Sequence, residues 1–98
     1  MKLLTAARAA VDLASIIGEA VDADIDLQPN RIVVLIHTTK GTPAEQQAAV
    51  TRIVEAFDDE PDLDLEYGTH LVVQGTYQGC PTRVVLYRTL HSRTVSAS

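Results

Sequence analysis

The stretch that decides the fold is Arg31-Ile-Val-Val-Leu-Ile-His37, followed by Thr38-Thr-Lys-Gly-Thr-Pro43 and then by residues 44–57. Residues 31–38 predict a strand, because apolar side chains alternate onto both of its faces. A strand that is apolar on both faces is typical of the interior of a sheet. We therefore expect this strand to form the centre of the domain.

The segment after this strand predicts an amphipathic helix that ends near Phe57. Thr42 and Glu45 have the spacing of a capping box, in which each side chain accepts a hydrogen bond from the other residue's backbone N–H. Pro43 fits the first helical position, where its missing N–H costs no hydrogen bond. Pro61 disfavours helical backbone at the residue before it, so the helix should end before that point.

The remaining elements complete a small α+β domain. The sequence predicts a first helix over residues 3–21, a short strand over 24–27 joined to the central strand by a hairpin, one bulged strand over 63–77 and a final strand over 82–90. The expected fold is two helices on one face of a mostly antiparallel four-stranded sheet, in the order α-ββ-α-ββ. We assign residues 1–90 to a single domain and residues 91–98 to a flexible tail.

Length and charge narrow the classes of function. The chain has 98 residues, one cysteine and a formal net charge of −5. All 13 acidic residues lie in residues 1–66, whereas residues 67–98 carry three arginines and no acid. This balance argues against direct binding of double-stranded nucleic acid, which depends on many cationic contacts to phosphate. The lone Cys80 is typical of a reducing compartment, and no membrane segment is apparent, so we expect a cytoplasmic protein.

One candidate ligand site is the loop over residues 38–42, between the central strand and the second helix. Helix N-termini attract anions through free N–H groups and the helix dipole. The loop supplies a candidate anion-binding or nucleotide-binding set of Thr39, Lys40, Gly41 and Thr42. The phosphate-loop pattern is absent, however, and ordinary turn and cap chemistry explains the same residues.

A second candidate is the acidic segment after the second helix. Asp58, Asp59, Glu60 and Asp62 form a surface suited to a basic partner, such as a nucleic-acid-binding protein that the segment would inhibit. The competing interpretation is a solvated helix end. The three histidines lack metal-ligand spacing, and Cys80 lies in a turn with no evident base, so we expect no metal site, no cofactor and no catalytic residues.

The third candidate is an interface on the sheet. Two helices cover one face of a sheet, yet apolar residues occur on both faces, and this excess predicts a surface for a partner. A closed two-fold dimer is the commonest oligomer, so a homodimer is our first expectation. The side chains that we assign to this interface are Leu71, Val73, Tyr77, Val84 and Leu86.

The second half of the chain also resembles a known kind of protein. The residues that carry the resemblance are Gly41-Thr42-Pro43-Ala44-Glu45, the helix with Val50, Ile53 and Val54, and residues 75–87. This pattern is similar to small uncharacterised proteins of actinobacteria and their phages. The resemblance implies no activity and no functional residues. It is consistent with an accessory phage protein that acts in the host cytoplasm by binding another protein.

Overall fold

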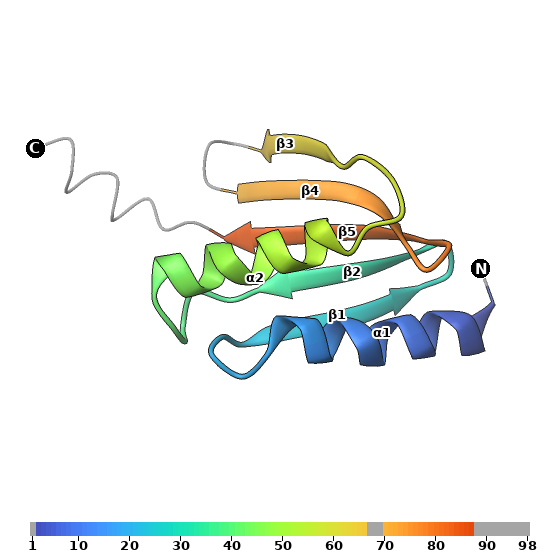
Figure 1. Ribbon diagram of the computed structural model, residues 1–98, viewed down its shortest axis with the longest axis horizontal. Helices are drawn as coiled ribbons and strands as arrows, with labels where there is room; N and C mark the ends of the chain where they lie inside the picture. Colours follow the sequence, from blue (N-terminus) through green and yellow to red (C-terminus); the bar gives the residue numbers. More distant parts are fainter. Residues whose placement is uncertain (1, 67–69, 88–98) are drawn as a thin grey trace, which may run out of the picture.

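Two helices lie on one face of a five-stranded sheet (Figure 1). The computed structural model describes residues 2–66 and 70–87. Along the chain the elements are α1 (Leu3–Ile17), β1 (Ala23–Gln28), β2 (Arg31–Ile36), α2 (Pro43–Glu55), β3 (Asp62–Glu66), β4 (His70–Tyr77) and β5 (Cys80–Tyr87). Across the sheet the strand order is β1-β2-β5-β4-β3. The edges of the described sheet are therefore β1 and β3.

Strand pairing is antiparallel everywhere except between β2 and β5. β1 and β2 form the predicted hairpin, in which Gln28 pairs with Arg31 across the two residues Pro29 and Asn30. β2 and β5 run parallel, with Val34 level with Val84. The parallel pair arises because the chain passes through α2 to the far edge of the sheet, where it forms β3 and β4, before β5 returns beside β2. β2 is an interior strand, as its two apolar faces predict.

The α+β class, the placement of both helices on one face and the mostly antiparallel sheet are all confirmed. The sheet has one more strand than we expected from the sequence. Residues 63–77 predict a single bulged strand, but β3 and β4 pair antiparallel, with Glu66 level with His70. Strands in globular proteins are usually five or six residues long, so the length of that segment already favours a hairpin. The predicted bulge at Gly68 and the predicted tail over residues 91–98 lie outside the described residues.

α1 ends four residues earlier than the periodicity predicts. Gly18 has a φ of 78°, and its N–H donates to the carbonyl of Ala14. Backbone in this left-handed region costs glycine little and ends helices commonly. From α2, the Arg52 guanidinium then donates to the carbonyls of Ile16 and Ile17, at 2.9 and 2.8 Å. This contact ties the two helices together, and it places a cation at the negative end of the α1 dipole.

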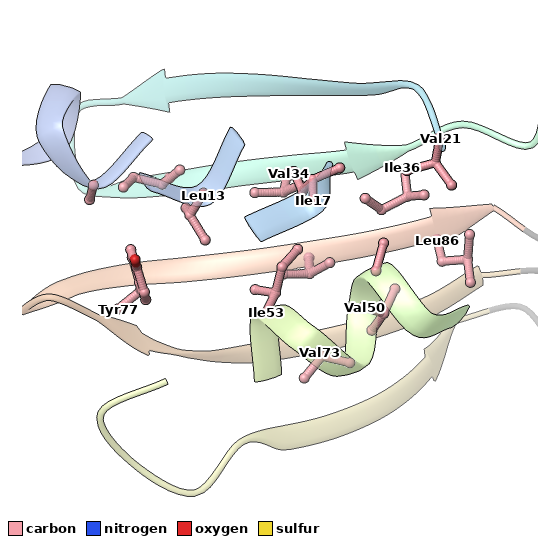
Figure 2. Packing of buried hydrophobic residues seen from close by; sticks show 14 of the residues in the cluster. Leu13, Ile17, Val21, Val34, Ile36, Val50, Ile53, Val73, Tyr77 and Leu86 are labelled. Atoms are coloured by element: carbon pink, nitrogen blue, oxygen red, sulfur yellow. The ribbon is translucent and has the colours of Figure 1, made fainter. Parts of the chain in front are cut away.

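The core lies between the two helices and the sheet (Figure 2). In α1, the buried side chains are Ala6, Ala9, Leu13 and Ile17, which face the sheet. In α2, the buried stripe includes Val50 and Ile53. The strands contribute alternate residues to the same core: Ile32, Val34, Ile36, Leu71, Val73, Tyr77, Cys80, Val84 and Leu86. The opposite face of the sheet is covered by no described helix, and we call it the open face.

Candidate functional site

All five side chains assigned to a sheet interface lie in the core instead. Leu71, Val73, Tyr77, Val84 and Leu86 are each at most 6% exposed, and they belong to the cluster that the helices cover. The sequence shows which residues share a face of a strand, but it does not show which face the helices take. The structure therefore corrects this assignment, because these five residues are not available to a partner.

The open face carries the other set of strand residues. Leu35 lies level with Val85, and Val85 lies level with Val72, so an apolar row crosses three neighbouring strands. Val72 and Val85 are only 1% and 6% exposed, and Leu35 is half-buried. Tyr87, at 38% exposed, is the most exposed large apolar side chain on the described part of this face.

The loop proposed for anion binding is closed by the helix cap. The Thr42 N–H donates to Glu45 Oε1 at 2.8 Å, and the Glu45 N–H donates to Thr42 Oγ1 at 3.1 Å, so the capping box is confirmed. Below the loop, the buried Gln46 side chain donates to the carbonyls of Lys40 and Gly41. Each of these contacts stabilises the N-terminus of α2.

Charge and backbone also disfavour an anion in this loop. The Glu45 carboxylate already lies at the positive end of the α2 dipole, where it would repel a second negative group. Gly41 has a φ of 85°, and a Cβ at this position would lie 2.5 Å from the carbonyl oxygen of Ala20. Gly41 thus packs closely against backbone. Thr39 and Lys40 are exposed, and no described contact brings them together as a binding set.

The acidic segment has a structural role that the sequence did not reveal. The Asp58 carboxylate accepts the backbone N–H groups of Gln78 and Gly79, which form the turn between β4 and β5. Asp59 accepts the backbone N–H and the hydroxyl of Thr76. These two aspartates therefore fix the end of the β4–β5 hairpin, although all four of the predicted acids are exposed. Two of the four thus have a structural role in addition to their place in the acidic segment.

The turn that Asp58 holds has an unfavourable backbone. Gln78 has a φ of 51° and Gly79 a φ of 77°, and a two-residue type I′ hairpin turn requires a positive φ at both of these positions. A side chain such as that of Gln78 adopts this region at a cost. Two hydrogen bonds from the turn to one carboxylate offset that cost, because hydrogen bonds to charged groups are stronger than neutral ones.

Replacing Asp58 by alanine should therefore lower the free energy of unfolding by about 1–3 kcal/mol, since both turn N–H groups lose their acceptor. Urea denaturation of the variant measures this loss. The matched control is Glu60→Ala, which should change stability by less than about 0.5 kcal/mol. Equal effects of the two substitutions would contradict the role given to Asp58.

The same turn also contacts α1. Gln78 Nε2 donates to Asp12 Oδ2 at 2.6 Å and to the Tyr77 hydroxyl at 3.2 Å. Burial raises the pKa of Tyr77, and the negative charge of Asp12 adds to this effect. The contact shows which way α1 faces: the flank that carries Asp12 points toward the β4–β5 turn.

The opposite flank of α1 is apolar and open to solvent. At about 100° per residue, Leu3, Ala7 and Ala14 lie about 140–180° around the helix from Asp12. They therefore point away from β4 and β5, toward the side of the molecule on which β1 forms the sheet edge (Figure 1). Leu4 and Val11 lie about 180° and 160° around the helix from the buried Leu13, so they point away from the sheet. Leu3, Leu4 and Val11 are 75%, 65% and 70% exposed.

β1 completes this side of the molecule. Leu27 is 37% exposed and lies on the helix-bearing face of the sheet, because it is level with the core residue Ile32. α1 contacts β1 along its length (Figure 1). Of the five large apolar side chains that are exposed in the described chain, Leu27 and Leu3 therefore lie toward this sheet edge, and Leu4 and Val11 lie on the adjoining outer surface of α1. We call the outer edge of β1 together with Leu3, Leu4, Val11 and Leu27 the β1 side.

The β1 side was not found from the sequence, although part of its signal is present there. The periodicity of α1 gives one wide apolar arc, from which we could not separate the buried residues from Leu4, Ala7, Val11 and Ala14. An amphipathic helix in a small domain usually buries about three or four apolar residues in every two turns. The larger number in α1 is the sequence signal for a second contact surface.

Comparisons with known proteins and tests for other kinds of site add no assignment. No protein-family model, curated protein or solved structure matches the chain. Among the residues that the structure describes, no group of three or more histidine, cysteine or acidic side chains is arranged to hold a metal ion. Neither described helix has the length and apolar character that crossing a membrane requires.

Proposed function

We propose that this protein is a non-enzymatic protein-interaction module that binds a partner polypeptide on its β1 side. The observation that carries the proposal is that Leu27 and Leu3 are exposed toward the β1 edge and that the exposed Leu4 and Val11 lie on the adjoining outer surface of α1. Single exposed apolar residues are ordinary, but a contiguous exposed patch usually marks an interaction site. The β1 side is also an edge strand, which offers unpaired backbone groups to a partner.

Introducing two negative charges on the outer surface of α1 tests the proposal. The variant Leu4→Glu/Val11→Glu should lose the proteins that the wild-type chain captures from a lysate of its own cells, because a partner would have to bury two charges. The matched control is Thr5→Glu/Ala48→Glu, which adds the same charges at exposed helical positions outside the surface formed by Leu3, Leu4 and Val11. This control should keep the captured proteins. An identical capture pattern for both variants and the wild type would overturn the proposal.

Self-association is a second form of interaction, and the side chains accessible on the open face are the ones that could support it. On that face Leu35 is half-buried and Tyr87 is 38% exposed, whereas Val72 and Val85 are buried, so a second copy of the chain would contact Leu35 and Tyr87. Sedimentation equilibrium should then give the mass of two chains at high micromolar concentration. Leu35→Glu should return the mass of one chain, while the β1-side variant Val11→Glu should remain dimeric. A single-chain mass for the wild type at every concentration would remove this part of the proposal.

A further inference from the structure

The outer edge of β1 carries a regular row of backbone groups with which no described strand pairs. The N–H of His37 donates to the carbonyl of Asp22, so the backbone of Asp22 points toward β2. Backbone direction alternates along a strand in an antiparallel pair. Asp24 and Asp26 therefore also pair with β2, whereas Ile25 and Leu27 direct their N–H and C=O groups outward. β1 pairs with no other described strand. Its outer edge can thus accept an added strand by main-chain hydrogen bonding.

Charge on β1 selects between possible strands. Asp24 and Asp26 project onto the open face, since they are level with Leu35 and Val33, and both are exposed. Each carboxylate has a local partner, His37 for Asp24 and Gln28 for Asp26, yet the Asp24 side chain remains 73% exposed. A second β1 paired antiparallel would bring acids opposite acids, which destabilises a strand pair. A strand with basic side chains on this face would meet both aspartates favourably.

On the helix-bearing face of the sheet, β1 favours an added strand with apolar side chains. Ile25 packs against the core and Leu27 is partly exposed, so residues of an added strand on this face would extend the core outward. Above them lies the outer flank of α1, with Leu3 exposed at one end. An added strand would extend the sheet beneath this flank of α1, just as the existing strands lie beneath the rest of the two helices.

We infer that the β1 side binds an extended segment of a partner protein in which basic and apolar residues alternate. The segment pairs with β1, its basic side chains face Asp24 and Asp26, and its apolar side chains pack beneath α1. This inference rests on the proposed function and names the chemistry of the partner. It also explains why the acids lie on this edge strand: they oppose pairing with a second copy while accepting a basic strand.

The test uses a capped heptapeptide of alternating lysine and valine as the probe, added to the full-length protein and followed by two-dimensional NMR. The signals of Ile25 and Leu27 should shift on titration. A peptide of the same sequence, N-methylated at the amides that would pair with β1, should not bind. It retains the charge, but it has no N–H groups to donate hydrogen bonds to the β1 carbonyls. A glutamate–valine peptide should also fail to bind.

Neutralisation of the strand tests the charge directly. Asp24→Asn/Asp26→Asn should weaken binding of the lysine–valine peptide by about two- to thirtyfold, since each opposite-charge cross-strand pair contributes modestly. The control, Glu55→Gln/Glu60→Gln, removes the same charge at exposed positions outside both edge strands and should leave the affinity nearly unchanged. Equal binding of the methylated peptide, equal weakening by both variants, or no binding at millimolar peptide would overturn the inference.

The two proposals fail in different ways. If Leu4→Glu/Val11→Glu leaves the captured proteins unchanged, the proposal that this protein is an interaction module is overturned. If that variant loses the captured proteins but the lysine–valine peptide neither binds nor competes with them, the interaction module stands. In that case the inference that its partner is a basic extended segment is overturned.

Discussion

Replacing Leu13 by alanine should lower the free energy of unfolding by about 2–5 kcal/mol, the largest effect expected of any single substitution in α1. Leu13 is fully buried between α1 and the sheet, where it packs with the core shown in Figure 2. The loss combines the transfer of its side chain from water with the cavity that remains. Because small domains are stable by only about 5–15 kcal/mol, this change should be visible as a large fall in the urea midpoint.

The matched control for Leu13 is Val11→Ala, two residues earlier in the same helix. Val11 is 70% exposed, so its truncation should change stability by less than about 0.5 kcal/mol. The sequence alone groups these two residues in one apolar stripe. If Val11→Ala destabilised the chain as much as Leu13→Ala does, the orientation assigned to α1 would be wrong.

Replacing Gly75 by alanine should cost about 1–3 kcal/mol through overpacking. Gly75 lies on β4 directly beneath the ring of Phe57, and an added Cβ would lie 2.6 Å from the ring Cε2 and closer still to Cδ2. The φ of Gly75 is not positive, so the cost comes from the ring rather than from the backbone. Thermal and urea unfolding of the variant measure it.

A double-mutant cycle isolates this contact. Once Phe57→Ala has removed the ring, Gly75→Ala should become neutral or slightly stabilising, because alanine loses less backbone entropy than glycine. The sign of the Gly75 substitution should therefore change with the residue at position 57. An unchanged cost in the Phe57→Ala background would show that something other than the ring requires glycine here.

Several local features follow directly from the sequence. The capping box at Thr42 and Glu45 and the hairpin across Pro29 and Asn30 depend only on neighbouring residues, and the structure confirms them. The interior position of β2 follows from its two apolar faces. Each of these features has a short-range physical cause, which explains why a single sequence suffices to predict it.

The features that required the structure depend on long-range contacts. Alternation shows that Leu71 and Val72 lie on opposite faces of β4, but only the position of the helices shows that Leu71 is in the core. The same holds for α1, where the choice between Leu13 and Val11 depends on the direction in which the helix faces. The role of Asp58 depends on a turn twenty residues further along the chain. The β1 side combines residues from two elements and has no local motif.

The central claim is that β1 is an open edge prepared to take a partner strand, and amide hydrogen exchange along β1 tests it most directly. In the isolated chain, the amides of Ile25 and Leu27 should exchange about tenfold or more faster than those of Asp24 and Asp26, because only the latter pair with β2. Addition of the lysine–valine peptide should slow Ile25 and Leu27 and leave Asp24 and Asp26 unchanged. Equal protection of all four amides in the isolated chain would mean that this edge is already paired, and would contradict the claim.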